Sequence, residues 1–580
     1  MTAARPAPGH GGRPSPGARI RHNDYTPLRP PALGAWSPRL TVSVVIPARD
    51  CQEALDRTLA ALAAQSYPAH LMDVVVADDG SSPALRVPAL APARTRIVRV
   101  PEGRWGRGWA RRTGAAAAEG EIVHWVDSDT VLDREHVEAH LRWHHLSPCT
   151  VVLGDVLFTP EGTAPGPSEI FAATGAGRTA ELFPEAAPHA YRADLLARTR
   201  WLREAGSGAF HLHSGAATSV PAALLRAAGG VDTALHMGED TDLGYRLAQA
   251  GAVFVPDPQA RGWHLGPSTV MQREKEVHRH NWSVLPDLIP DLRWLRTHPR
   301  RTWRVPYVDV VVDARGACYE DVRASVDAAL AGTLPDAAVT VLGPWHELTG
   351  GRRSALDDPL LDLRLVRNLY EHEPRVSFAG RLPATSAPAP FRLLLPAGWV
   401  LGPDALARMT DLARREEYGL LSVALDEGAD GVLAARLERT AAFARAALAA
   451  SWEGREGADG ASPGGPDGVA GSGPGGADVP DDPRALDDLV HELFGSFWAG
   501  AEEFGVTRAG EAEPATGELS RWQASTARWK REALRLRREL DELRADNDRL
   551  RAEVEEARAG RRRVPLLGFV PAARRQDGAG

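Results

Sequence analysis

The sequence of 580 residues has few cysteines and no long run of apolar residues. Its three cysteines, Cys51, Cys149 and Cys318, are far apart and lack the close spacing of a structural zinc site, so we expect reduced thiols. No stretch of about 18 uninterrupted apolar residues is present, and residues 1–38, rich in Pro, Gly and Arg, lack the apolar core of a signal peptide. These absences predict a cytoplasmic protein without a membrane-spanning helix.

A large excess of positive charge is also missing. The chain has 68 basic and 76 acidic residues and a formal net charge of -8, whereas binding to a phosphate backbone requires a broad basic surface. We therefore expect no nucleic-acid partner. Hydrophobic residues make up 43% and charged residues 25%, as in globular proteins, and the length predicts two or more domains.

Apolar segments followed by acidic residues recur in the first part of the chain. The three segments are 41–47, 74–77 followed by Asp78 and Asp79, and 122–126 followed by Asp127 and Asp129. Helical spacing of leucines between the first two segments indicates alternating strands and helices, which is typical of a mostly parallel α/β sheet. Ligands bind beyond the carboxyl ends of such strands, so we expect these carboxylates to converge on one crevice.

Asp127 and Asp129 lie two residues apart at the end of a predicted strand. Carboxylate oxygens are ligands that Mg²⁺ and Mn²⁺ prefer, and an ion held there would neutralise a diphosphate. Aspartates in a turn after a strand are, however, more often solvated turn residues. Taken alone, the pair leaves both interpretations open.

Six short motifs occur in the order found in family 2 glycosyltransferases, which the sequence resembles over roughly residues 41–268. They are Ser43-Val44-Val45-Ile46-Pro47, Gln65-Ser66-Tyr67-Pro68, Val76-Ala77-Asp78-Asp79-Gly80-Ser81, Ala110-Arg111-Arg112-Thr113-Gly114, Asp127-Ser128-Asp129 and Gly238-Glu239-Asp240-Thr241-Asp242-Leu243. The resemblance implies a Rossmann-like fold of the glycosyltransferase A type. It also implies an inverting enzyme that uses Mn²⁺ or Mg²⁺ and a nucleotide diphosphate sugar, commonly UDP-linked. The expected acceptor is a hydroxyl of a glycan, a lipid-linked glycan or another glycoconjugate.

The resemblance further implies roles for individual residues. Asp240 matches the general base, with Glu239 as its acidic neighbour. The implied nucleotide-sugar contacts are Pro47, Arg49, Asp50, Asp78, Asp79, Arg111 and Asp127, and the implied metal ligands are Asp127, Asp129 and His264. For His264, a hydrogen-bonded histidine in the core or at the rim of the site is an equal alternative.

Several features depart from the family pattern or allow two interpretations. Arg49-Asp50 replaces the usual aromatic residue and asparagine after the first strand, so the identity of the nucleotide stays open. The basic, aromatic stretch 104–109 suits either a segment that closes over a diphosphate or an ordinary surface loop. The histidines at near-helical spacing, without Cys or Glu partners, predict a polar helix face rather than a metal site; they are His136, His140, His144 and His145.

A second α/β segment begins at Tyr307 and faintly repeats the first. Pro396 and Gly398 lie where the first segment has Asp127 and Asp129, so this copy lacks the acidic pair. We expect a degenerate, noncatalytic copy that serves acceptor binding or subunit packing.

The expected organisation has seven parts. They are a disordered tail (1–38), the catalytic domain (39–300), the degenerate copy (305–450), a flexible linker (453–482), a short helical segment (483–506), a coiled coil (518–560) and a basic tail (561–580). Leucines at heptad spacing and Asn547 favour a homodimer through a parallel coiled coil, with a single helix docked on its own chain as the alternative. The basic tail suits solvent or a weak contact with the inner face of the membrane.

Two other functions compete with a glycosyltransferase. A sugar-phosphate nucleotidyltransferase is also an α/β enzyme that uses metal, but residues 48–52 do not resemble its glycine-rich, basic triphosphate loop. A noncatalytic scaffold would not need the acidic positions that the first segment retains.

Overall fold

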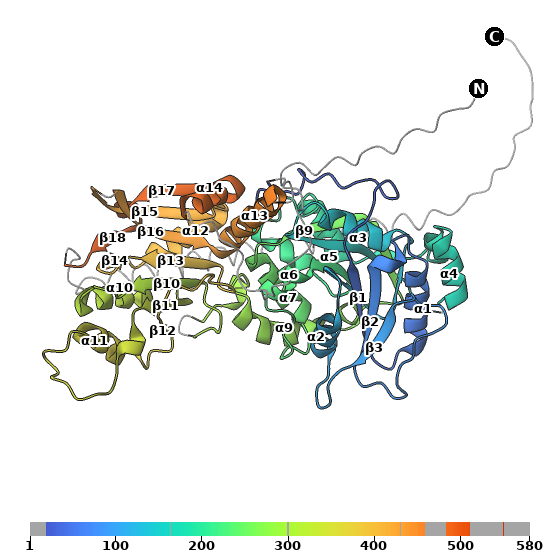
Figure 1. Ribbon diagram of the computed structural model, residues 1–580, viewed down its shortest axis with the longest axis horizontal. Helices are drawn as coiled ribbons and strands as arrows, with labels where there is room; N and C mark the ends of the chain where they lie inside the picture. The colour runs from blue at the N-terminus through green and yellow to red at the C-terminus, as the bar shows by residue number, and fades with distance from the viewer. Residues whose placement is uncertain are drawn as a thin grey trace, which may run out of the picture. The chain divides into compact units, whose positions relative to one another are not determined.

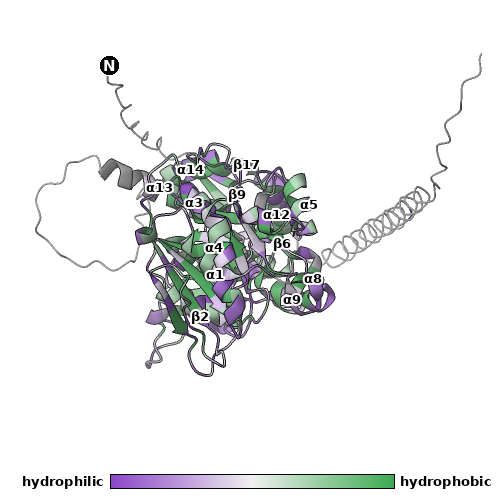
Figure 2. Ribbon diagram, turned by 90° about the vertical axis from the view of Figure 1, so that its right-hand side faces the viewer, coloured by the Kyte–Doolittle hydropathy of each residue, from purple (hydrophilic) through white to green (hydrophobic). Residues whose placement is uncertain are grey.

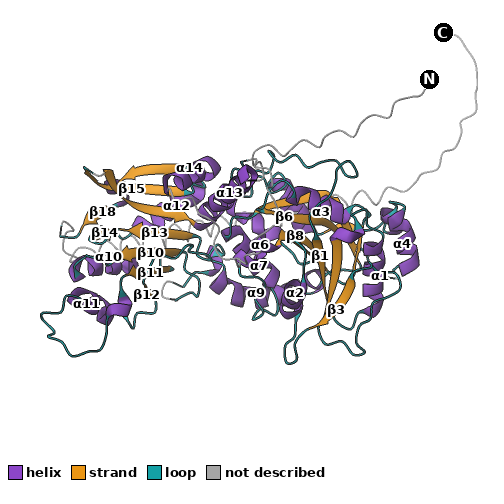
Figure 3. Ribbon diagram, in the orientation of Figure 1, coloured by secondary structure: helices purple, strands orange, loops and turns teal. Residues whose placement is uncertain are grey.

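The computed structural model describes residues 19–162, 164–298, 301–429, 431–458, 483–510 and Arg549. The chain divides into two units, Met1–Glu511 and Ala512–Gly580. The described residues of the first unit form two α/β domains, each built on its own large sheet (Figures 1 and 3). This confirms the predicted α/β class with a second domain of similar type. Apart from Arg549, the predicted coiled coil and basic tail lie outside the described residues.

The first sheet has nine strands in the order β3-β2-β1-β4-β8-β6-β9-β5, with β7 paired to β6. Strands β1 to β4 run parallel, whereas β8 is antiparallel to its neighbours β4 and β6. The strands are β1 Val42–Ala48, β2 Met72–Asp78, β3 Thr95–Arg99, β4 Ile122–Val126, β5 Thr130–Leu132, β6 Thr150–Phe158, β7 Ala187–Pro188, β8 Ala217–Pro221 and β9 Val253–His264.

Helices cover both faces of this sheet, because alternate residues of a strand point to opposite faces. In β1, Val44 and Ile46 join one core with Leu55 of α1, whereas Val45 joins the core on the other face. Hydrophobic residues accordingly concentrate in the strands (Figure 2). The helices are α1 Gln52–Ala63, α2 Arg107–Ala117, α3 His136–His144, α4 Pro167–Gly175, α5 Ala190–Arg198, α6 Ala222–Ala227, α7 Glu239–Gln249, α8 Thr269–Gln272 and α9 Glu274–Leu288.

The second sheet repeats the strand order of the first, as β12-β11-β10-β13-β16-β15-β17. The pairing directions also agree: β16 is antiparallel to β13 and β15, and β17 is parallel to β15. The strands are β10 Val308–Asp313, β11 Ala337–Leu342, β12 Val376–Ala379, β13 Phe391–Leu395, β14 Trp399–Leu401, β15 Leu420–Gly428, β16 Gly431–Arg439, β17 Ser496–Gly500 and β18 Val506–Arg508, with β14 paired to β18. The helices are α10 Tyr319–Ala331, α11 Leu361–Tyr370, α12 Ala405–Arg415, α13 Thr440–Ala458, α14 Pro483–Phe494 and α15 Ala501–Phe504.

The structure differs from three of the expected boundaries. The segment 19–38 packs on the protein instead of belonging to a disordered tail, because Ile20 and Tyr25 are buried and Asn23 Nδ2 donates to the Leu202 and Phe254 carbonyls. Helix α13 continues beyond the expected start of the linker at residue 453. The segment 483–506 is not only helical, since β17 extends the second sheet.

Among the residues that the structure describes, no helix combines the length and the apolar character needed to cross a bilayer.

Helix α3 is buried along its whole length, so the prediction of a polar helix face was wrong. His136, His140 and His144 face the sheet at exposed fractions of 0%, 0% and 3%. Their polar side chains suggested a solvated face, but their spacing of four residues places them on one buried side. Burial lowers the pKa of His136 to about 4, and burial together with His145 lowers the pKa of His144 to about 3.

Acidification is expected to destabilise the fold. An unfolded histidine takes up a proton near pH 6.5, whereas His144 stays neutral in the folded state until about pH 3. Each such ring therefore lowers the free energy of unfolding by about 1.4 kcal/mol per pH unit between pH 6.5 and its folded-state pKa. Urea unfolding at a series of pH values measures this slope. The H144Q variant should show a shallower slope, whereas H70Q, at an exposed histidine, should match the wild type.

Candidate active site

An open cleft of about 660 Å³ lies at the carboxyl ends of the parallel strands in the first sheet. The residues that line it are Pro47, Ala48, Arg49, Asp79, Arg107, Ala110, Asp127, Ser128, Asp129 and His264. They come from the ends of β1, β2, β4 and β9 and from the start of α2. Six residues for which the sequence predicts donor or metal contacts therefore meet in one cleft.

Asp127, Asp129 and His264 form a cluster in this cleft, with ligand atoms that all lie within 4.8 Å of one another. The antiparallel pairing of β5 and β9 brings them together, because it sets Thr130 opposite His264. The Leu265 amide donates to the Asp129 carbonyl oxygen at 2.8 Å, and His264 Nε2 lies 3.3 Å from Asp129 Oδ1.

The hydrogen bonds of His264 fit a metal ligand. Its Nδ1 lies 2.9 Å from the Gly266 carbonyl oxygen, which can only accept, so Nδ1 carries the hydrogen in the neutral ring. The Nε2 lone pair then faces the carboxylates of Asp127 and Asp129. Burial, reinforced by the charge of Asp127, raises the pKa of Asp129. A divalent cation would satisfy this set of two carboxylates and one imidazole.

Arg111 lies beneath the cleft and does not line it. Its guanidinium Nη1 donates to Glu239 Oε1 at 2.8 Å and its Nη2 to Asp127 Oδ1 at 3.4 Å. Arg111 and Glu239 are 5% and 3% exposed. The sequence predicts that Arg111 contacts the nucleotide sugar. In the structure its guanidinium binds and orients the carboxylates of Glu239 and Asp127.

Gly215 makes room for this arginine. A Cβ atom at position 215 would lie 1.5 Å from Arg111 Nη2, so any other residue would displace the guanidinium. No local sequence pattern predicts the role of Gly215, because Arg111 lies about 100 positions earlier in the chain.

Glu239 and Asp240 begin α7, directly after Gly238, whose φ of 80° is left-handed. Burial raises the pKa of Glu239, against the opposing charge of Arg111. Asp240 is half-buried, and its Oδ1 accepts from the Thr241 amide at 2.8 Å. Asp240 is not among the residues that line the cleft. It is connected with the candidate metal ligand Asp127 through its neighbour Glu239 and the Arg111 side chain.

Asp79 has one free acceptor. Its Oδ2 accepts from the Gly106 amide at 2.8 Å, whereas its buried Oδ1 has no hydrogen-bond partner among the residues that the structure describes. A buried carboxylate oxygen without a partner is costly, and an N–H or O–H of a ligand in the cleft would satisfy it.

Asp78 and Asp50, which the sequence predicts to contact the nucleotide sugar, instead accept hydrogen bonds from loop amides. Asp78 is buried and accepts from the Ser81 amide at 2.8 Å, and Asp50 accepts from the Ser82 amide at 2.8 Å. Neither lines the cleft.

The stretch 104–109 borders the cleft. Trp105 stacks on His236 with ring centroids 4.3 Å apart, and the Arg104 guanidinium lies 4.8 Å from the Trp109 ring. Arg107 lines the cleft, although the sequence left the role of this stretch open.

Residues 43–201 match the family model described as glycosyl transferase family 2. The family match thus covers residues 43–201 of the N-terminal domain, which we call the glycosyltransferase domain. The chain is 34% identical over 151 residues to validoxylamine A glucosyltransferase of Streptomyces hygroscopicus subsp. limoneus, in a match that covers 25% of this chain and 33% of the relative. The chain thus spans a third of the length of this curated relative.

Two solved structures are also similar to this glycosyltransferase domain. Mannosyltransferase PcManGT from Pyrobaculum calidifontis, in complex with GDP-Man and Mn²⁺, is 18% identical, with a TM-score of 0.28. That match covers 42% of this chain and 62% of the mannosyltransferase. S. aureus TarS is 19% identical, with a TM-score of 0.29, and the match covers 42% of this chain and 39% of TarS.

The second domain repeats the strand pairing beside the cleft without the candidate metal ligands. Strand β14 pairs with β18 as β5 pairs with β9, and Arg508 lies opposite Trp399 as His264 lies opposite Thr130. The Ala509 amide donates to the Gly398 carbonyl at 2.7 Å, which repeats the bond to the Asp129 carbonyl. Pro396, Gly398 and Arg508 thus replace all three candidate metal ligands.

Removal of Arg111 is expected to destabilise the glycosyltransferase domain. The R111M variant leaves Glu239 buried without its cation, and loss of one partner of a buried ion pair costs about 3–5 kcal/mol. Urea unfolding measures the change.

Two further variants test whether the loss of stability comes from the Arg111–Glu239 ion pair. The double variant R111M/E239Q should regain part of the loss, because the uncompensated charge is gone. R112M, at the exposed neighbour on α2, should unfold like the wild type. Equal losses in R111M and R112M would contradict a structural role for the ion pair.

Proposed function

We propose that the protein is an inverting, metal-dependent glycosyltransferase that transfers a hexosyl or related sugar from a nucleotide diphosphate sugar, a UDP-sugar in our proposal. The acceptor is a hydroxyl of a glycan, a lipid-linked glycan or another glycoconjugate. One observation carries this proposal: Asp127, Asp129 and His264 cluster in the same cleft as Asp79. The match to glycosyl transferase family 2 over residues 43–201 supports it.

The nucleotide binds, in this proposal, at the side of the cleft formed by β1 and β2. The free Oδ1 of Asp79 accepts from an N–H of the base or a hydroxyl of the ribose. Arg49 and Pro47 line the same cleft, and the planar guanidinium of Arg49 suits stacking on a base.

Asp127, Asp129 and His264 would hold the cation, which would offset the negative charge that develops on the leaving diphosphate. A ligand set with an imidazole nitrogen favours Mn²⁺ over Mg²⁺, which prefers oxygen ligands. Arg107 lines the cleft and adds a positive charge on the protein side.

Asp240 is the proposed general base. Its carboxylate takes the proton of the acceptor hydroxyl while the hydroxyl oxygen forms a bond to the anomeric carbon. The bond between that carbon and the diphosphate oxygen breaks on the opposite face, and the diphosphate leaves with the electron pair. A single displacement of this kind inverts the configuration at the anomeric carbon.

The noncatalytic second domain contributes to acceptor binding or to subunit packing in this proposal. Pro396, Gly398 and Arg508 offer no carboxylate or imidazole for a metal ion. The homodimer through a parallel coiled coil likewise stays a proposal, because the predicted heptads lie outside the described residues.

Replacement of the proposed base tests the reaction directly. D240N is expected to lower the rate of nucleotide-sugar hydrolysis or transfer by about 100-fold or more, because it removes proton transfer without changing the shape of the site. Donor binding in the presence of Mn²⁺, measured by calorimetry, should stay within about twofold of the wild type.

The control for this experiment is D194N, at an exposed aspartate on α5. It should hydrolyse a panel of nucleotide sugars like the wild type. If the wild type neither binds nor turns over any nucleotide sugar with Mn²⁺ present, the scaffold alternative holds instead. Turnover of a sugar phosphate and a nucleoside triphosphate would favour the nucleotidyltransferase.

Replacement of a metal ligand has a different signature. D129A and H264A should each weaken Mn²⁺ binding about tenfold or more, and donor affinity should fall with it, because the diphosphate loses its counter-charge. Electron paramagnetic resonance of free Mn²⁺ measures the affinity. Unchanged Mn²⁺ binding in both variants would contradict the proposed site.

A further inference from the structure

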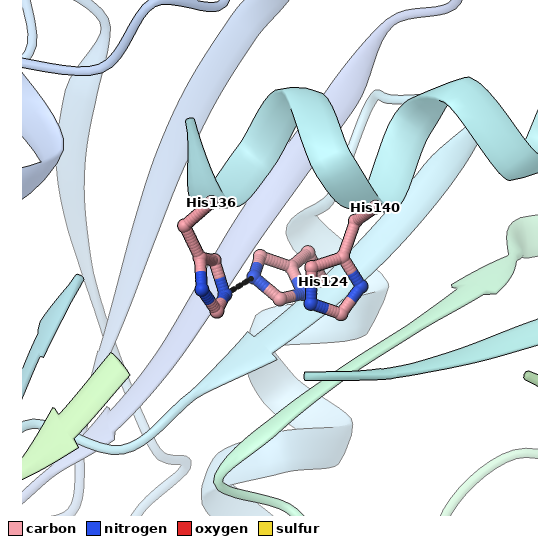
Figure 4. A group of neighbouring side chains, drawn as sticks. All are labelled: His124, His136 and His140. Carbon is pink, nitrogen blue, oxygen red and sulfur yellow. Dashed lines mark hydrogen bonds between the residues drawn. The ribbon is translucent and has the colours of Figure 1, made fainter. Parts of the chain in front are cut away.

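Three histidines meet in the core of the glycosyltransferase domain, away from the cleft. His124 lies on β4, and His136 and His140 lie on α3, which packs on this part of the sheet. All three are 0% exposed. Figure 4 shows the three rings turned toward one another, and one ring nitrogen of each lies within 4.8 Å of the others.

The hydrogen bonds of His136 and His124 direct lone pairs into the cluster. His136 Nδ1 lies 2.8 Å from the Arg261 carbonyl oxygen, which can only accept, so the lone pair of the neutral ring is on Nε2. His124 Nδ1 lies 3.3 Å from the Thr218 carbonyl oxygen in the same way. The two Nε2 atoms face each other at 3.1 Å.

A chain of hydrogen bonds fixes the third ring. The Ser147 carbonyl accepts from Thr150 Oγ1, which therefore accepts from His144 Nδ1. His144 Nε2 then accepts from the Ser219 hydroxyl at 2.7 Å. The Ser219 oxygen in turn accepts from His140 Nδ1 at 2.8 Å, so the lone pair of His140 is on Nε2.

In these tautomers the Nε2 atoms of His124, His136 and His140 each carry a lone pair, and no N–H or O–H group of the cluster donates to them. His140 Nε2 is buried and has no hydrogen-bond partner among the residues that the structure describes. If the His124 hydrogen were on Nε2, it could be donated to His136 Nε2. His124 Nδ1 would then carry a lone pair that faces the lone pairs of the Thr218 carbonyl oxygen, which is unfavourable. Protonation of one ring would also supply a hydrogen, but burial lowers the pKa of all three rings and so disfavours the charged form.

The second domain shows that the fold does not need histidines at these positions. Counted from the equivalent strands β5 and β14, the residues at the places of His124, His136, His140 and His144 are Leu393, Ala405, Met409 and Ala413. These four are also buried, and all are apolar. Likewise, Leu393 pairs with Leu437 where His124 pairs with Ser219. Packing alone therefore does not explain the histidines.

We propose that His124, His136 and His140 bind a divalent transition-metal ion, Zn²⁺ by preference, through their Nε2 atoms. Zinc–nitrogen bonds of about 2.0–2.1 Å in a tetrahedron place the nitrogens about 3.3–3.4 Å apart, close to the observed 3.1 Å between His124 and His136. The oxygens that accept from the three Nδ1 atoms are the outer partners that metal-binding histidines need.

Gly154 lies beside the cluster. A Cβ atom there would lie 3.0 Å from His140 Nε2 and 3.0 Å from the Ala260 carbonyl oxygen. Any side chain at this position would therefore crowd the ring nitrogen, and a water molecule or a hydroxide ion would be the fourth ligand of the proposed ion.

The ion would stabilise the strands that carry the catalytic ligands. His124 precedes Asp127 by three residues on β4, and Arg261, whose carbonyl orients His136, precedes His264 by three residues on β9. The role is structural, and it does not depend on the proposed reaction.

Metal analysis of full-length protein without a histidine tag tests this proposal. In the double variant D129A/H264A, which lacks the ligands in the cleft, about one zinc per chain should remain after dialysis against zinc-free buffer. Addition of H140Q to that background should reduce the zinc content to about a tenth or less, whereas addition of H70Q should leave it unchanged.

Two further measurements keep the test valid if H140Q does not fold. Addition of G154A should weaken zinc binding about tenfold or more, because the methyl group presses on His140 Nε2. Cobalt added to the metal-free D129A/H264A protein should give the visible absorption of a tetrahedral nitrogen site. A folded D129A/H264A protein that binds neither zinc nor cobalt would overturn the proposal, as would equal zinc content in the H140Q and H70Q variants.

Discussion

The candidate active site depends on the pairing of two short strand segments, β5 and the end of β9. Asp127 and Asp129 lie in the turn that leads into β5, and His264 is the last residue of β9, more than 130 positions later. Backbone hydrogen bonds between these strands hold the imidazole against the carboxylates, so the geometry of the cluster does not rely on flexible side chains alone. Ligands held by main-chain pairing are already oriented before an ion arrives, which reduces the entropy lost on binding.

A second constraint is the distribution of charge below the cleft. Several carboxylates near one another repel, and desolvation raises their free energy further. Arg111 offsets this repulsion for Glu239 and Asp127 from the buried side, while Asp127, Asp129 and His264 all line the cleft. The arginine thus keeps Glu239 and the start of α7 next to Asp127, and the absence of a side chain at Gly215 allows it to do so.

The sequence predicted the parts of this fold that local patterns encode. Strands β1, β2 and β4 are mostly apolar, and the aspartates at or just after their ends mark the carboxyl edge of the sheet because parallel strands end on the same side. It did not predict features that depend on distant contacts, such as Gly215 next to Arg111 or the extension of the second sheet by β17. Polar composition was misleading for α3, whose histidines are buried because both the sheet and the segment before β1 cover the helix.

Comparison of the two domains distinguishes residues that the fold needs from residues that the proposed chemistry needs. Pairing of β14 with β18, including the amide bond to the Gly398 carbonyl, persists although Arg508 has replaced the histidine and no carboxylate remains. The strand arrangement therefore does not require the side chains of Asp127, Asp129 and His264. Placing two carboxylates and an imidazole this close carries an electrostatic penalty that the second domain avoids. A cation in the cluster would offset that penalty further than Arg111 does for Asp127, so the contrast between the domains supports the proposal that the metal site belongs to the first domain.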